Sequence, residues 1–416
     1  MILGCGKLVP ARGDVTDPVG YTTLEAVPGE QRVLPLGLYR MDGIRVPVSA
    51  VSGNVISLAW AVSEENVSRL GSCFLQVREG LREGVSMRVA AISGASLTTR
   101  FDPMGMIQAG DMLEVISERT VGGIMSRATQ AEINWGTDPE NSDLIGIWNP
   151  QLQETTTLFA KEGVGWVDAE DAAAGDRSAT VVPHPCPLLY TRRGDEILSF
   201  LVVGAVPMPS RQRYFRVWTG RNFLSMGVNP LEGSVADYFQ SAGVFDIQSG
   251  RSAPASDVIR IHDWQSGVSP FFYRASSSGS GFEWREIGQS GPASAYPVEL
   301  FEALEFHRRG VSKFVRFEGF TIPTSLGPAA STPLARSSAP AGVEGAELID
   351  VKSRDSGIRV EWYSEPGVAY RVQWSAASYR GWEDWSPTVT AEGERCWVDC
   401  ERRPGGLIRI IEETES

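Results

Sequence analysis

The sequence predicts an all-β protein built from several β-sandwich or β-barrel modules, with an internal duplication and a small C-terminal β-sandwich. Three observations lead to this prediction. Short segments alternate apolar and polar residues, as half-buried strands do. Glycine and proline, 44 and 25 of the 416 residues, separate these segments, and turns recur at intervals of roughly ten residues. A set of motifs also occurs twice, about 115 residues apart, which indicates that one supersecondary unit is used twice.

The first segment, residues 1–14, is expected to be disordered or to be the remnant of a signal sequence. Ile2-Leu3-Gly4-Cys5 resembles the end of a lipoprotein cleavage box, although the apolar segment of a complete signal peptide is missing. Residues 15–125 are predicted to form an N-terminal β domain. Its expected strands lie at 54–58, 73–77, 85–99 with a turn at Gly94, and 112–116.

The duplication divides the next part of the chain into a first unit at 126–210 and a second at 211–323. The units share an aspartate before a β-branched strand, a lone tryptophan, an Arg-Arg-Gly tripeptide, and a glycine followed by proline. These positions are Asp143 and Asp257, Trp166 and Trp284, 192–194 and 308–310, and Gly204 and Gly319. Because each Arg-Arg-Gly lies between two strands, it is predicted to be a hairpin turn with glycine at positive φ.

Helices are expected to be few. The apolar spacing of 297–304 suits a helix, but the corresponding segment 183–190 contains three prolines, which exclude one there. Both segments are therefore expected to be mainly extended. The best candidate for a helix is the short segment 235–240, ahead of Gly243.

The end of the chain has a different composition. Residues 324–345 are rich in proline, alanine and serine and are predicted to be a semi-extended linker. Residues 346–416 follow with alternating strands at 358–362 and 370–374, which predict a small β-sandwich of the fibronectin-III type.

The bulk properties exclude some functions. A net charge of −13 repels phosphate backbones, so no nucleic-acid partner is expected. The longest apolar runs fall short of the roughly 18 residues of a membrane-spanning helix, so no transmembrane segment is expected. Cys396 and Cys400 lie in one predicted strand, about 13 Å apart, which is too far for a disulfide.

Motifs for catalysis or cofactor binding are absent from the sequence. It contains no HExxH or CxxC metal motif, no GxSxG or SxxK nucleophile motif, and no Walker A or GxGxxG loop. The acidic segments 138–143 and 168–176 lack the EF-hand spacing and are interpreted as solvated loops. We therefore predict a protein that is not an enzyme, with no catalytic, cofactor-binding or metal-binding residues and no cofactor.

The best candidates for ligand binding are Trp374, Trp382 and Trp385, on or near one loop of the C-terminal sandwich. Exposed aromatic rings beside charged residues stack on sugar rings or anchor a protein partner. The alternative is that these tryptophans fill the core of the small sandwich.

Three segments resemble an uncharacterised family of exported all-β proteins known mainly from Verrucomicrobia. They are Asp17-Pro-Val-Gly-Tyr21, Val51-Ser-Gly-Asn-Val-Ile-Ser57 and Ala109-Gly-Asp111, and the resemblance covers residues 15–323. Ala369-Tyr-Arg-Val-Gln-Trp-Ser375 is similar to the small sandwich that ends many exported proteins of these bacteria. The resemblance implies export and an all-β architecture; it implies no activity and no catalytic residues.

Together these observations predict a non-catalytic exported structural or adhesive protein, extracellular or in the cell envelope, whose partner is a glycan or another surface protein. The alternative is a β-protein that binds or degrades polysaccharide. The polar residues differ between the two units: Gly146 against Arg260, Asn149 against the region of His262 and Asp263, and Thr191 against His307. A specific function is expected where the units diverge or in the C-terminal sandwich.

Overall fold

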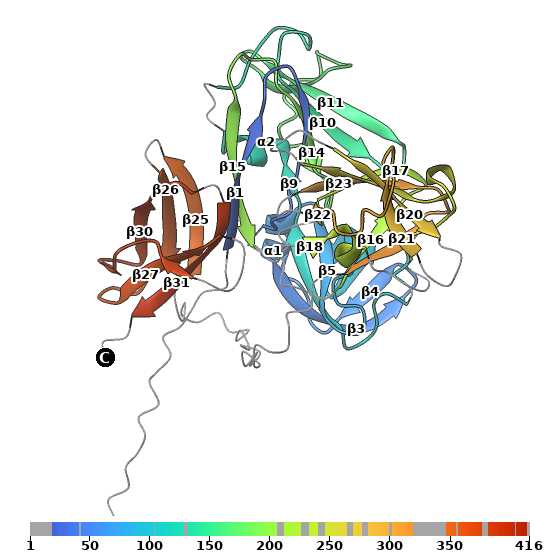
Figure 1. Ribbon diagram of the computed structural model, residues 1–416. Helices are drawn as coiled ribbons and strands as arrows, with labels where there is room; N and C mark the ends of the chain where they lie inside the picture. The colour runs from blue at the N-terminus through green and yellow to red at the C-terminus, as the bar shows by residue number, and fades with distance from the viewer. Residues whose placement is uncertain are drawn as a thin grey trace, which may run out of the picture. The chain divides into compact units, whose positions relative to one another are not determined.

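The computed structural model describes residues 19–40, 43–103, 105–128, 132–205, 212–225, 233–239, 246–263, 269–276, 282–298, 302–318, 347–354, 357–376, 382–403 and 405–413 (Figure 1). The predicted disordered segment 1–14, the predicted linker 324–345, Cys5 and Gly319 lie outside these residues. The chain forms two compact units, one of Thr22–Ala329 and one of Met1–Tyr21 with Ala330–Ser416. Strands dominate both units, which confirms the all-β prediction. No helix in the described ranges has the length and apolar character needed to cross a membrane.

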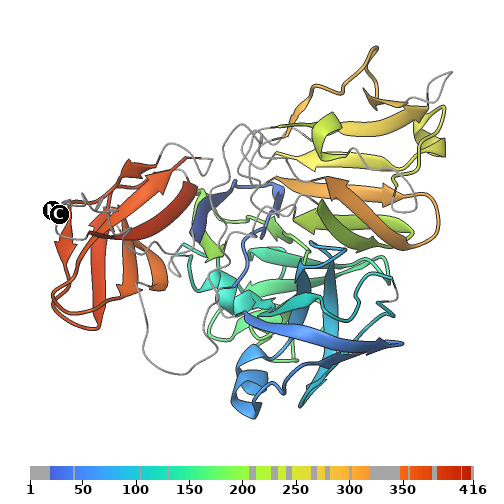
Figure 2. The ribbon, with the colours of Figure 1, turned by 90° about the horizontal axis from the view of Figure 1, so that it is seen from below.

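A closed six-stranded barrel occupies residues 44–117 of the larger unit (Figure 2). Its order is β3-β4-β7-β6-β5-β8, with β3 at Ile44–Ser52, β4 at Val55–Leu58, β5 at Cys73–Glu79, β6 at Ser86–Ser93, β7 at Ser96–Thr99 and β8 at Met112–Ser117. The expected strands of this region are all present, and Gly94 forms the β6–β7 turn with a φ of 55°. Helix α1 (Glu64–Leu70), capped by the Ser63 hydroxyl, was not expected.

Two five-stranded sheets follow the same strand order. The first runs β12-β11-β10-β14-β2, with β12 at Gly165–Asp168, β11 at Glu154–Lys161, β10 at Leu144–Asn149, β14 at Leu188–Thr191 and β2 at Gln31–Leu34. The second runs β21-β20-β19-β23-β17, with β21 at Phe282–Glu286, β20 at Phe271–Ser276, β19 at Val258–His262, β23 at Ala303–Arg308 and β17 at Gly220–Ser225. Position by position, β10 corresponds to β19 and β14 to β23.

The register is also the same in the two sheets. Leu144 lies opposite Thr191 in the first sheet, and Val258 lies opposite His307 in the second. In each case a short capped helix and a two-stranded ladder are inserted in the chain between the strands of the sheet. They are α2 (Val121–Met125) with β9 (Arg119–Thr120) and β13 (Val181–Val182) in the first, and α3 (Val235–Tyr238) with β18 (Gly233–Ser234) and β22 (Pro297–Val298) in the second. The barrel lies in the chain between β2 and β9, so the first sheet takes β2 from the segment 15–125.

The Arg-Arg-Gly segments do connect strands, but the prediction of positive φ for their glycines is wrong. Gly194 and Gly310 are not among the glycines with positive φ. A Cβ at Gly194 would instead clash with the guanidinium group of Arg192, and one at Gly310 would clash with that of Arg308. Glycine is needed here because an arginine side chain folds back over the turn.

The remaining strands of the larger unit lie beside the sheets. Strand β15 (Leu198–Ala205) neighbours β1 (Val19–Ala26), and β16 (Gln212–Val217) pairs with β24 (Lys313–Glu318). The two five-stranded sheets pack on one another through a small apolar cluster of Val33, Trp148 and Leu189 from the first and Phe223 and Ala303 from the second.

The smaller unit has two sheets (Figure 1). One is β25-β26-β30, with β25 at Glu347–Arg354, β26 at Gly357–Tyr363 and β30 at Arg395–Cys400. The other contains β27 (Ala369–Ser375), β28 (Glu383–Asp384), β29 (Val389–Thr390) and β31 (Gly405–Glu413). Cys396 and Cys400 lie on β30 as buried free thiols, as their spacing predicts.

Candidate functional site

Among the described residues, five ionisable side chains gather on one face of the second five-stranded sheet. Side chains alternate between the two faces of a strand, and the register places Arg221 opposite His307 and Arg260 opposite Glu305. The face therefore carries Arg221 and Phe223 from β17, Ala303, Glu305 and His307 from β23, and Arg260 and His262 from β19. The other face carries the apolar core around Ile259, Leu304 and Phe306. We call the residues Arg221, Arg260, His262, Glu305 and His307 the Glu305 cluster.

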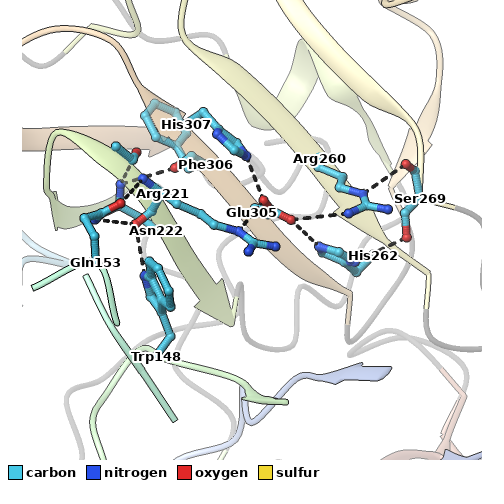
Figure 3. Close-up of polar contacts among 11 residues, drawn as sticks. Trp148, Gln153, Arg221, Asn222, Arg260, His262, Ser269, Glu305, Phe306 and His307 are labelled. Carbon is cyan, nitrogen blue, oxygen red and sulfur yellow. Dashed lines mark hydrogen bonds and ion pairs between the residues drawn. The ribbon is translucent and has the colours of Figure 1, made fainter. Parts of the chain in front are cut away.

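Glu305 is the centre of the cluster (Figure 3). Only 2% of the residue is exposed. Its carboxylate accepts hydrogen bonds from His262 Nε2 at 3.0 Å, His307 Nε2 at 2.7 Å and Arg221 Nε at 2.5 Å, and Arg260 Nη1 lies 3.6 Å away. Burial raises the pKa of a carboxyl, but the hydrogen bonds from His262, His307 and Arg221 outweigh it and hold the pKa of Glu305 well below its usual range.

His262 connects Glu305 to a serine. Burial lowers the pKa of His262 below its usual value, which keeps the imidazole neutral at pH 7. Its Nε2 faces Glu305, and its Nδ1 lies 3.2 Å from Ser269 Oγ. Nε2–H therefore donates to the carboxylate, and Nδ1 accepts from the hydroxyl.

A serine hydrogen-bonded to a histidine that is hydrogen-bonded to a carboxylate is the arrangement used for nucleophilic catalysis. Such a site also needs donors aimed at the oxyanion that the reaction creates. Arg260 contacts the backbone of the Ser269 segment: its Nε donates to the Ser269 carbonyl oxygen at 3.3 Å, while its Nη1 faces Glu305. These two contacts hold the segment just before β20, which carries Ser269, beside the cluster.

A contact with the first sheet fixes the position of Arg221. The Arg221 backbone N–H donates to Gln153 Oε1 at 2.7 Å, and its carbonyl accepts from Trp148 Nε1 at 3.0 Å and Gln153 Nε2 at 2.9 Å. Gln153 has a φ of 58°, in the left-handed region, which is unusual for a residue with a side chain. Gly220 lies so close to the Gln153 amide that a Cβ would collide with it. A strained residue and a glycine thus join the two sheets beside the cluster.

The cationic side chains of the cluster extend from the buried carboxylate to solvent. The side chains of Arg221, Arg260 and His307 are 42%, 32% and 29% exposed. The guanidinium carbon of Arg221 lies 4.4 Å from the centre of the Phe223 ring, and that of Arg260 lies 4.6 Å from the centre of the Phe271 ring. The aromatic rings support the guanidinium groups from one side and leave their edges accessible.

The corresponding positions of the first sheet carry no such cluster. Leu189 stands where the second sheet has Glu305, Gly146 where it has Arg260, and Thr191 where it has His307. The pairs of Gly146 with Arg260 and Thr191 with His307 match those proposed from sequence. Asn149 corresponds to Asp263, within the region proposed for it, and His262 corresponds to Trp148. Sequence reasoning missed Glu305, Arg221 and Ser269. A single charge inside the apolar segment 303–306 was the available indication for Glu305.

The three predicted aromatic residues occupy different environments in the smaller unit. Trp385 is buried, 9% exposed, and stacks on Tyr21 with ring centroids 5.7 Å apart. Trp374 and Trp382 are half-buried, and the guanidinium groups of Arg403 and Arg409 lie 4.1 and 4.3 Å from the centres of their rings. The structure therefore places Trp385 in the core and leaves the other two partly accessible.

The most exposed tryptophan of the smaller unit's described residues was not among the predicted candidates. Trp397 on β30 is 52% exposed, and the guanidinium of Arg359 lies 3.8 Å from the centre of its ring. Arg359 also donates twice to the Asp399 carboxylate at 2.8 Å. Trp397 alternates with the buried Cys396 and Cys400 along β30, so its outward position could have been read from the period of the strand.

The acidic segments close local turns. Asp138 accepts hydrogen bonds from the backbone and side chain of Asn141, and Asp176 accepts from the backbone N–H groups of Trp166 and Ser178. Within the described ranges, no three histidine, cysteine or acidic side chains are grouped so that they could hold a metal ion.

Comparison with known proteins found no match: no family model, no curated protein and no solved structure is similar to this chain.

Proposed function

We propose that this protein is a non-catalytic structural or adhesive protein, exported to the cell surface or envelope, in which two copies of one β-scaffold support a binding surface on the second copy. The observation that carries the proposal is a buried ion pair present in both five-stranded sheets. Asp143 and Asp257, both fully buried, precede β10 and β19. Each pairs with the first arginine of an Arg-Arg-Gly segment, Arg192 or Arg308.

The ion pairs connect the same structural elements in the two sheets. Asp143 accepts from Arg192 Nη1 at 2.6 Å and from the Arg193 backbone N–H at 2.7 Å. Asp257 accepts from Arg308 Nη1 and from the Arg309 backbone N–H at 2.8 Å. Each aspartate thus fixes the start of one strand to the turn after its neighbour. The ion pairs that the two sheets share stabilise the fold. This supports the proposal that the specific function lies in the residues that differ between the sheets.

The location and role can be tested together in the native organism. Cells are fractionated, and intact cells are treated with protease before the protein is detected. We expect the protein in the envelope or extracellular fraction, accessible to protease, and weaker surface attachment by cells that lack it. A protein found only in the cytosol and protected from protease would contradict the proposal.

A second candidate function, binding of polysaccharide, is favoured by the outer face of the β25-β26-β30 sheet. Trp397 lies opposite Glu361, and Arg359 lies opposite Asp399, so an exposed indole is surrounded by charged hydrogen-bonding groups. Exposed aromatic rings with polar neighbours suit sugars, whose rings have apolar faces and hydroxyl edges.

The polysaccharide candidate predicts a difference between two tryptophans. Retention of the full chain on immobilised polysaccharides should be lost in Trp397→Ala and kept in Trp382→Ala, whose ring lies against Arg409. Equal retention of wild type and Trp397→Ala on every polysaccharide retained by the wild type would contradict this candidate.

A further inference from the structure

We propose that the Glu305 cluster is a binding site for the carboxylate of an acidic sugar, with Arg221 and Arg260 as the residues that contact it. The inference rests on the proposed binding surface of the second sheet and specifies its ligand. It concerns a different unit from the Trp397 face and does not depend on that candidate.

The Glu305 cluster carries more positive than negative charge. Arg221 and Arg260 contribute two positive charges, and Glu305 contributes one negative charge, so the cluster has a surplus of one positive charge even with both imidazoles neutral. The whole chain carries a net charge of −13, so a local positive surplus is not a general property of its surface. An anion is therefore attracted to this face and repelled by the chain as a whole.

Arg221 and Arg260 have N–H donors that a ligand can use. A guanidinium group has five N–H donors. With the described residues, the side-chain hydrogen bond of Arg221 uses its Nε, and the polar contacts of Arg260 use its Nε and Nη1. Both side chains are about a third or more exposed, at 42% and 32%. The other amino groups of these two residues are the donors that a ligand can reach.

The two arginines are held in place before a ligand binds. Two neighbouring arginines repel each other, and the buried Glu305 carboxylate between them offsets that repulsion and fixes their orientation. The contacts of Gln153 and Trp148 with the Arg221 backbone hold β17 in place. A ligand then binds without the entropic cost of ordering these side chains. The first sheet has Gly146 and Leu189 at the positions of Arg260 and Glu305, so the same scaffold exists without this site.

The geometry favours a carboxylate on a sugar. A planar guanidinium matches a carboxylate through paired N–H donors. Next to Arg260, Phe271 and Tyr273 on β20 project from the same face, because they lie opposite Arg260 and Val258 in the register, and both are half-exposed. Aromatic rings beside a guanidinium suit a sugar ring that carries an acid group, with the ring on the aromatic side chain and the acid on the arginine.

The test measures binding of the full chain to polygalacturonate at low salt, by affinity electrophoresis and calorimetry. The variants are Arg221→Gln and Arg260→Gln, and the matched control is Arg45→Gln. Arg45 lies on β3 of the barrel and not on this sheet, is 44% exposed and lies 3.7 Å from Glu114. We expect each cluster variant to raise the Kd about tenfold, the effect of losing a hydrogen bond to a charged group, and the control to leave it unchanged. Thermal unfolding verifies that each variant is folded, and Arg221→Lys, which keeps the charge but loses the planar fork, should retain part of the affinity.

Three results would overturn the inference. The first is no binding of the wild type to polygalacturonate at low salt. The second is equal weakening by Arg45→Gln, which would indicate diffuse charge attraction. The third is equally tight binding of polyglutamate with the same dependence on Arg221 and Arg260, which would indicate an acidic protein as the ligand. None of these results affects where the protein is located, so the site and the proposed function fail separately.

Discussion

Asp143 and Asp257 occupy corresponding positions at the starts of β10 and β19, and each is fully buried against the arginine of a distant turn. A further pair of contacts repeats with them: Asp143 accepts from the Asn134 backbone N–H at 3.0 Å, and Asp257 accepts from that of Gln248 at 2.8 Å. A carboxylate with this many donors is satisfied only while the strand, the loop before it and the Arg-Arg-Gly turn are all in place. The aspartate therefore stabilises the packing of three segments at once.

Asp143→Asn and Asp257→Asn should each destabilise the larger unit strongly. Removing one charge of a buried ion pair leaves the other uncompensated, which costs about 3–5 kcal/mol. The free energy of unfolding, measured with urea, tests this expectation. Glu283→Gln is the control, because its pair with Arg285 is largely exposed and contributes about 0–1 kcal/mol. A change of less than about 1 kcal/mol in both aspartate variants would contradict the importance of these pairs.

Much of this framework could be predicted because it depends on local patterns. Alternation and glycine turns located the barrel strands at 54–58, 73–77 and 112–116, and the shared motifs located Asp143 and Asp257. The role of β2 in the first sheet could not be predicted. Its partner β14 lies beyond the whole barrel in the chain, and a four-residue strand of sequence Gln-Arg-Val-Leu has no local pattern that specifies a partner so distant. Non-local pairing is decided by packing, which a single sequence does not display.

Glu305→Gln should remove part of the dependence of stability on acid pH. The hydrogen bonds from His262, His307 and Arg221 hold the pKa of Glu305 in the folded protein below its unfolded value, near 4.5. Such a group contributes stability that is fully present above the unfolded pKa and is lost as pH falls toward the folded pKa. The free energies of unfolding of wild type and variant should differ most above pH 5 and converge as pH falls below about 4.5. Urea titrations at several pH values measure the difference, and a constant gap from pH 7 to pH 3 would contradict the assignment.

The cluster itself illustrates the limit of prediction for the site. The pairs Gly146 with Arg260 and Thr191 with His307 were visible as differences between two similar segments. Glu305, at the centre, was not, because the charges that surround Glu305 come from three strands, two of which are distant from it in the sequence. Arg221 and Glu305 are separated by more than 80 residues in sequence and meet only because β17 pairs with β23.

Trp385→Ala and Trp397→Ala should differ in their effect on the smaller unit. Trp385 is buried and stacks on Tyr21, so its removal leaves a cavity and should cost about 3–5 kcal/mol. Trp397 is 52% exposed, so its removal should change stability by about 1 kcal/mol or less. Thermal unfolding followed by tryptophan fluorescence compares them. A larger loss for Trp397→Ala than for Trp385→Ala would place Trp397 in the core and contradict its proposed role as a binding surface.

His184 should make the larger unit less stable as pH falls from neutral. Its imidazole is enclosed by Phe74, at 4.0 Å between ring centroids, with Tyr39 and Phe215 at its edges. Burial, with a smaller effect of the nearby Arg213 charge, lowers the pKa of His184 to about 3. The unfolded chain therefore binds a proton near pH 6.5 that the folded protein refuses, and stability falls by up to about 1.4 kcal/mol per pH unit from pH 6.5 toward pH 3. His184→Phe keeps an aromatic ring in the cluster but cannot be protonated, so its free energy of unfolding should decline less steeply over that window, which begins two pH units above that of Glu305. Parallel curves for wild type and variant between pH 6.5 and 4.5 would show that His184 is protonated equally in both states and would refute its enclosure.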